Sequence, residues 1–107
     1  MDLTLLQNLM GGDEKLVSHF VQIFKSQVPV QVASLSSLCA DGEWESLSTA
    51  LHSLKTQFTY VGLTDFAEQM RSMEEDVDNG ETASIPSRID NFLTAFNAFW
   101  NAEFPAF

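Results

Sequence analysis

Apolar residues recur three and four positions apart in four long stretches of the chain, which is the spacing of one face of an α-helix. The most regular stretch runs from Trp44 to Val61 and ends at Gly62, and the stretch after it ends at Val77. No segment of appreciable length alternates strictly between apolar and polar residues, as a half-buried β-strand does. The pattern therefore predicts an all-α protein.

The N-terminal part of the chain predicts a short helix followed by a long one. Four leucines between positions 3 and 9 form the short helix, which ends at the glycines 11 and 12, and Asp13 is suited to cap the next helix. Pro29 interrupts that helix although the periodicity continues beyond it, so we expect a kink or a brief break rather than a domain boundary. The predicted core face of its first half consists of Leu16, Phe20, Ile23 and Phe24.

The C-terminal part predicts a polar loop at residues 78–87 and a last helix with Phe92, Phe96 and Phe99 on its apolar face. Four amphipathic helices joined by short turns predict an antiparallel four-helix bundle with a short extra N-terminal helix. With 107 residues, the chain is expected to form a single domain, residues 1–107. We expect its aromatic tail, residues 99–107, to pack onto the bundle or to contact a partner.

Charge and composition narrow the class of partner. Five Lys and Arg against 15 Asp and Glu give a net charge of -10, which repels nucleic acid and anionic membrane surfaces. No apolar run approaches the roughly 20 residues of a membrane-spanning helix, and the N-terminus lacks a secretory signal, so we expect a cytoplasmic protein. The lone Cys39 has no partner for an internal disulfide and is expected in a helix core.

His52 is the candidate reactive residue. On a helical wheel it lies more than about 90° from the centre of the apolar stripe of its helix, so its side chain is expected to face outward. Most of its neighbours on this face are small, which leaves room for another protein to approach. These neighbours are Ser48, Thr49, Thr56 and Thr59, with the longer Glu45 and Lys55.

The turn at Gly62 is expected to bring a carboxylate toward this histidine. His52 lies ten residues before Gly62 and Glu74 lies twelve after it, which places both roughly 15 to 18 Å from the turn in an antiparallel helix pair. A carboxylate on one ring nitrogen fixes the tautomer and leaves the other nitrogen as a nucleophile, and Lys55 supplies positive charge for a phosphoryl group there. An exposed histidine with a lysine three residues later is also common on ordinary surfaces, so the residues alone leave both interpretations open.

The stretch LHSLKTQFTYVGLTDFAEQMRSMEE, residues 51–75, resembles the signature of histidine-containing phosphotransfer (HPt) domains. In that family an H-x-x-K core is followed by a glycine ten residues after the histidine and an acidic or amide residue twenty-two after it. The matching positions are His52, Lys55, Gly62 and Glu74. The segments GGDEKLVSHFVQIF and ADGEWESLSTALHSLK also resemble the family, so the similarity covers most of residues 9–80.

The resemblance implies a bundle that carries phosphoryl groups in two-component signalling, between a histidine kinase or hybrid kinase and a response-regulator receiver domain. It implies that His52 accepts the phosphoryl group from a receiver aspartate or a kinase and passes it to a receiver aspartate. Glu74 would orient the imidazole, and Lys55 would stabilise the phosphoryl charge. No cofactor or metal is expected on this chain, because the receiver brings the Mg²⁺. The small residues around the histidine are expected to form the receiver-docking region: Ser48, Thr49, Thr56 and Thr59.

One departure from the family pattern lies directly after the lysine. HPt domains usually have glycine at that position, whereas this chain has Thr56, followed by the bulky Gln57 and Phe58. Thr56 shares the exposed face with His52, so we expect it to narrow the approach or to offer a hydroxyl to the phosphoryl group. The departure is expected to affect the rate of phosphotransfer and the choice of partner.

An alternative function stays open beside the phosphocarrier. The chain has no glycine-rich phosphate-binding loop, so we expect a carrier and not a kinase with its own ATP site. The alternative is a degenerate HPt-like scaffold that binds a signalling partner without phosphotransfer. A metal-binding bundle would need inward carboxylates in Glu-x-x-His pairs, which the sequence lacks, and His19 is expected on the polar surface of its helix.

Overall fold

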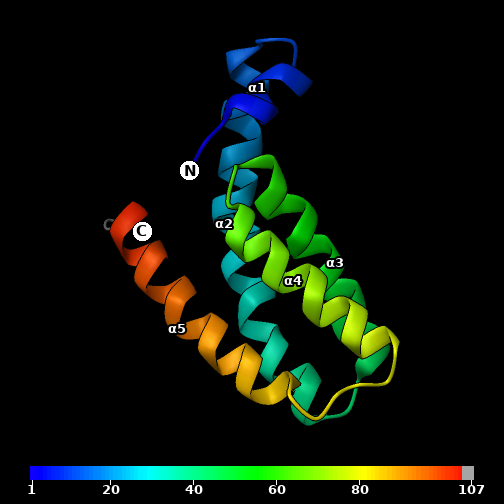
Figure 1. Cartoon of the computed structure of the whole chain (residues 1–107). Coiled ribbons are helices and arrows are strands. Elements are labelled where there is room, and N and C mark those ends of the chain that lie inside the picture. Colours follow the sequence, from blue (N-terminus) through cyan, green and yellow to red (C-terminus); the bar gives the residue numbers. More distant parts are fainter. Residues whose placement is uncertain (105–107) are drawn as a thin grey trace.

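The computed structural model describes residues 1–104 and is an all-α bundle, as the periodicity predicted (Figure 1). The final three residues of the predicted aromatic tail, 105–107, lie outside the described residues. The molecule measures 42 × 28 × 19 Å. Its helices are α1 (Thr4–Leu9), α2 (Glu14–Ala40), α3 (Trp44–Tyr60), α4 (Thr64–Asp78) and α5 (Ile85–Glu103).

Four long helices form the antiparallel bundle, and α1 is the short extra helix at its N-terminal end (Figure 1). Asp13 caps α2 as predicted, since its side chain accepts hydrogen bonds from the backbone N–H groups of Lys15 and Leu16. The longest side-by-side packing is between α3 and α4, which are joined by the tight turn at Gly62. These two helices carry the candidate site.

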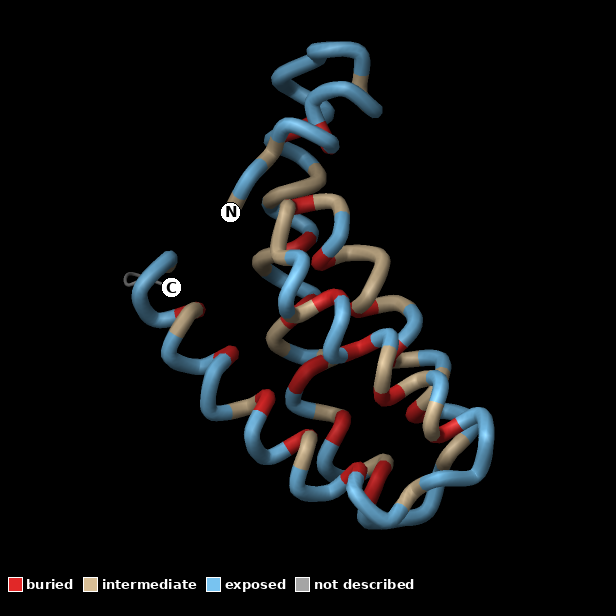
Figure 2. Tube along the Cα trace, viewed as in Figure 1, coloured by how far each residue is buried: buried red, intermediate tan, exposed pale blue. Residues whose placement is uncertain are grey.

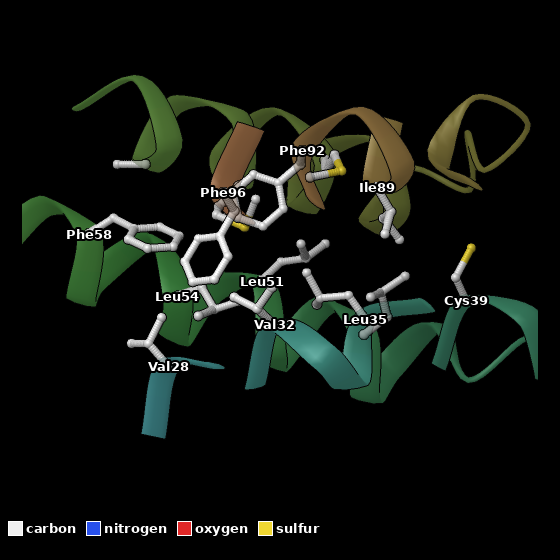
Figure 3. Packing of buried hydrophobic residues seen from close by; sticks show 14 of the residues in the cluster. Val28, Val32, Leu35, Cys39, Leu51, Leu54, Phe58, Ile89, Phe92 and Phe96 are labelled. Atoms are coloured by element: carbon white, nitrogen blue, oxygen red, sulfur yellow. The ribbon is translucent and has the colours of Figure 1, made fainter. Parts of the chain in front are cut away.

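Buried positions lie along the inner faces of the helices (Figure 2), and their side chains point toward one another between the helices (Figure 3). Phe58 of α3 is fully buried and makes aromatic contacts with Phe24 of α2, Phe66 of α4, and Phe92 and Phe96 of α5. One ring therefore joins all four long helices in a single packed centre. Within residues 1–104, no helix is long and apolar enough to span a bilayer.

Cys39 lies at one edge of this core, as expected for a small apolar residue of a helix (Figure 3). Its burial raises the pKa of the thiol above the ordinary value. Cys39 is therefore a packing residue with little thiolate character.

Of the kink or brief break expected at Pro29, the break does not occur, because α2 continues without interruption from Glu14 to Ala40. Proline removes one helical N–H donor and crowds the carbonyl four residues earlier, which favours a break in an isolated helix. Here Val28 and Val32, on either side of the proline, are both buried in the core. Tertiary packing of this face outweighs the local preference.

The predicted core face of α2 was partly wrong. Phe24 is buried as predicted, but Leu16 and Ile23 are exposed, at 49% and 38% of their surface, because the buried stripe includes Val17 and Val28 instead. Leu16 and Ile23 lie seven residues apart and Val30, which is 70% exposed, lies seven further, so the three share one line along the helix. The helix has two adjacent apolar stripes, of which the bundle covers one.

The predicted loop at residues 78–87 is shorter in the structure, because α5 already begins at Ile85. Ile85 is fully buried, and Pro86 occupies the first turn of the helix, where the missing N–H needs no partner. The helix therefore begins one residue before the proline, at the buried Ile85.

The N-terminal segment packs closely on the turn between α3 and α4. The backbone N–H of Asp2 donates a hydrogen bond of 2.9 Å to the carbonyl of Val61, directly before Gly62. Gly62 has a φ of +74°, and a Cβ placed on it would lie 2.6 Å from the Cβ of Asp2 and 2.7 Å from its carbonyl oxygen. Glycine is thus needed there for both the left-handed backbone and the close approach.

We predict that Gly62→Ala destabilises the fold more than Gly80→Ala. Both glycines have left-handed φ values, +74° and +75°, so alanine costs roughly 1 to 2 kcal/mol of backbone strain at either position. Only Gly62 also has the Asp2 backbone in the way, which adds about 1 to 3 kcal/mol. Urea unfolding of the two variants measures the difference, and equal free energies of unfolding would show that the N-terminal segment moves aside freely.

Candidate functional site

His52 lies on the outer surface of α3, and its side chain is 62% exposed, which confirms the outward orientation expected from the wheel. Its Nδ1 lies 2.9 Å from Oε2 of Glu74 on α4, so the expected proximity of these two residues is confirmed. An ionised carboxylate can only accept a hydrogen bond, so Nδ1 carries the donating proton. The second ring nitrogen, Nε2, is then left with a lone pair on an exposed ring.

Glu74 holds two partners with its two oxygens. While Oε2 accepts from His52, Oε1 lies 3.2 Å from the Nζ of Lys55, one turn further along α3. The Glu74 side chain is only 17% exposed, so this contact is screened less than a surface ion pair. The carboxylate therefore ties the lysine and the histidine into one polar cluster.

The antiparallel pairing of α3 and α4 places this cluster. Ser48, one turn before His52, donates a 2.6 Å hydrogen bond to Oδ1 of Asp78, one turn after Glu74. The two helices are thus joined along one edge by successive polar pairs, at the register that the Gly62 turn fixes.

The four residues predicted for docking are on the surface of α3, but their hydroxyls already have partners. Thr49, Thr56 and Thr59 each donate to the helix carbonyl four residues earlier, and Ser48 donates to Asp78. Such back-bonding leaves the threonine methyl groups as part of the surface. Their role in docking stays a prediction.

The three residues that depart from the family pattern have different environments in the structure. Phe58 is fully buried in the core, so its ring is not part of the surface beside His52. Gln57 donates a 2.8 Å hydrogen bond to Gln31 on α2 and so links two helices. The hydroxyl of Thr56 donates to the carbonyl of His52 at 3.2 Å, and Thr56 is half-buried beside the histidine.

Two parts of the network were missed in the sequence. Asp78 was assigned to a loop and not to the histidine edge, although its spacing of four from Glu74 is the signal that places both on one helix face. Arg88 of α5 contacts Ser72 and Asp76 of α4, and no sequence pattern predicted this contact because the irregular loop between α4 and α5 does not reveal their register.

The remaining ionisable candidates do not form a second site. His19 is exposed, as expected. Among residues 1–104 there is no group of three or more His, Cys, Asp or Glu side chains arranged to hold a metal ion.

Comparison with known proteins identifies a family. The sequence model described as the Hpt domain matches residues 19–102 of this chain. Neither curated proteins nor solved structures gave a match. The matched range includes the histidine, the lysine and the glutamate of the cluster.

We predict that Glu74→Ala releases the imidazole of His52, whereas Glu75→Ala does not. Without Glu74 the ring loses the acceptor on Nδ1 and returns to the mixture of tautomers of a free imidazole. Glu75 is the adjacent carboxylate but bonds Arg71 of its own helix. Nitrogen-15 NMR of the His52 ring distinguishes the tautomers, and similar spectra for both variants would contradict the assignment of Nδ1–H to Glu74.

Proposed function

Because the chain belongs to the Hpt domain family, whose role is phosphotransfer in two-component signalling, we propose that His52 is the residue that carries the phosphoryl group. The observation that carries this proposal is the 2.9 Å contact between His52 Nδ1 and Glu74. That contact holds one nitrogen as a donor and supports nucleophilic attack by the other, exposed nitrogen. His19 has no such arrangement among its contacts.

The proposed step is a direct displacement at phosphorus. Nε2 of His52 attacks the phosphorus of an aspartyl phosphate, an N–P bond forms, and the P–O bond to the aspartate breaks. The aspartate leaves as a carboxylate, and the proton stays on Nδ1. The ring thereby gains a positive charge, which the Glu74 carboxylate at 2.9 Å offsets. The reverse step returns the phosphoryl group to an aspartate.

Lys55 is proposed to assist through its charge. Its ammonium lies 3.2 Å from Glu74, one helical turn from His52. This bond keeps the positive charge near the histidine, where it can interact with a phosphoryl group. A phosphoryl group on His52 would compete with Glu74 for this ammonium. Glu74 and Lys55 are therefore proposed as the orienting and charge-stabilising residues, respectively.

The proposed partners are a response-regulator receiver domain and a histidine kinase or hybrid kinase. Hpt domains interact with such proteins in two-component systems. The receiver would hold the Mg²⁺ that neutralises its own phosphorylated aspartate, so no cofactor is assigned to this chain.

The proposed docking surface is the exposed seam between α2 and α3. Gln57 and Gln31 join these helices, and Ile23 and Val30 lie outward of the join on the apolar line of α2. We propose that the surface extends from these apolar groups of α2 across the outer face of α3 to the small residues around the histidine, of which Ser48 lies at the edge with α4. Those residues are Ser48, Thr49, Thr56 and Thr59.

We predict that incubation with a phosphorylated receiver labels this protein and its His19→Gln variant, but not the His52→Gln variant. The His52→Gln variant has lost the nucleophile that accepts the phosphoryl group, so its labelling should be abolished and not merely reduced. The measurement is the transfer of radioactive phosphate, with the label lost in acid as a phosphohistidine is. Label that stays on the receiver in every case, while the two proteins still bind, would favour the scaffold function instead.

Docking can be tested separately with Val30→Asp. Because Val30 is 70% exposed, the substitution leaves the core intact, yet it places a charge in the proposed apolar contact. We expect receiver affinity to fall by about tenfold or more. Ala98→Asp, at an exposed position of α5, is the control for added charge. An equal effect of both substitutions on the dissociation constant would exclude the α2–α3 seam as the docking surface.

A further inference from the structure

We propose that Arg88 of α5 is a positioning residue for the phosphotransfer site, because it fixes the rotation of α4 that presents Glu74 to His52. The inference rests on the proposed function of His52. Arg88 touches neither the histidine nor Glu74, and it acts through two other residues of α4. Its guanidinium bonds Oδ2 of Asp76 at 2.6 Å and Oγ of Ser72 at 2.7 Å.

The two contacts of Arg88 flank Glu74 in the sequence and lie across the helix from it. Ser72 and Asp76 are each two residues from Glu74, which is about 160° to 200° around the helix axis at about 100° per residue. α4 is therefore held by polar bonds on two sides. α3 holds it through Glu74 and Asp78, and α5 holds it through the Arg88 fork.

The core contacts of α4 are poorly suited to fix this rotation alone. Its buried residues are Ala67, Met70, Met73 and Val77, of which the two methionines are unbranched and adapt to irregular space. The neighbouring helices instead bury stiff or bulky side chains, such as Leu51 and Phe58 of α3. A helix with a soft core face depends more on its polar contacts for a unique orientation.

The seam between α4 and α5 is also open next to Arg88. A surface hollow there is lined by Glu68, Gln69, Ser72, Met73, Arg88 and Asn91. Outside the buried Met73, the surface side chains of α4 and α5 therefore do not close over the seam at this level, and the Arg88 fork is the polar link across it. At the other end of α4, Phe66 makes edge-on or tilted ring contacts with three phenylalanines of α5. Aromatic contacts therefore hold α4 to α5 at that end, and the Arg88 guanidinium bonds α4 at this end.

The geometry tolerates little rotation. An atom about 6 Å from the axis of a helix moves by about 1 Å when the helix turns by about 10°. A movement of that size directed along the contact takes the 2.9 Å bond between His52 and Glu74 beyond the range of a hydrogen bond. A small loosening of α4 is thus enough to release the imidazole while the fold remains intact.

The test compares Arg88→Met with Arg71→Met in the full chain. Both variants remove one arginine and one positive charge, but Arg71 pairs only with Glu68 and Glu75 of its own helix. In Arg88→Met we expect the nitrogen-15 NMR signals of the His52 ring to move toward the free tautomer mixture, and transfer from a saturating phosphorylated receiver to slow by about tenfold. Arg71→Met should leave both unchanged. Arg88→Lys, which can reach one of the two acceptors, should keep part of the original His52 ring signal and part of the transfer rate.

Several outcomes overturn the inference. One is a His52 ring spectrum in folded Arg88→Met that matches the unmodified protein, and another is an equal change in Arg71→Met. If Arg88→Met does not fold, Ser72→Ala and Asp76→Asn take its place, because each removes or weakens one of the two bonds of Arg88. Unchanged His52 ring spectra in both variants would also overturn the inference. The spectra require no phosphotransfer, so failure of this inference is distinguishable from failure of the proposed function.

Discussion

The shared carboxylate of Glu74 is the interaction on which the site depends. It contacts His52 and Lys55 at once, so a single side chain sets the tautomer of the histidine and holds the nearby positive charge. Glu74 can do so because it is mostly shielded from solvent while the ring it orients is mostly exposed. This arrangement supports the proposed function, because the ring is held on its Glu74 side and exposed on the side from which a partner protein would approach.

The core of the bundle and its polar edges have different tasks. The aromatic centre around Phe58 joins the four long helices and accounts for the existence of the bundle. Apolar contacts are not directional, however, so they determine helix rotation less strictly than hydrogen bonds do. The bonds of Glu74 to α3 and of Arg88 to Ser72 and Asp76 supply that direction for α4.

Charge is distributed unevenly over the bundle. α4 carries six acidic residues, whereas α2 carries one, Glu14, at its first turn. An aspartyl phosphate is itself anionic and is repelled by acidic surfaces. This charge distribution supports the proposed docking at the seam of α2 and α3, which also carries the exposed apolar line of Ile23 and Val30.

The sequence by itself determined the helices, the outward orientation of His52 and the proximity of Glu74. These follow from local periodicity and from a tight glycine turn, which both act over short distances along the chain. Tertiary structure alone decided which of two apolar stripes of α2 is covered, that α2 continues through Pro29, and that Arg88 reaches α4. The first two depend on packing energy that outweighs local preference, and the last depends on how α4 and α5 meet across an irregular loop, whose register the sequence does not reveal.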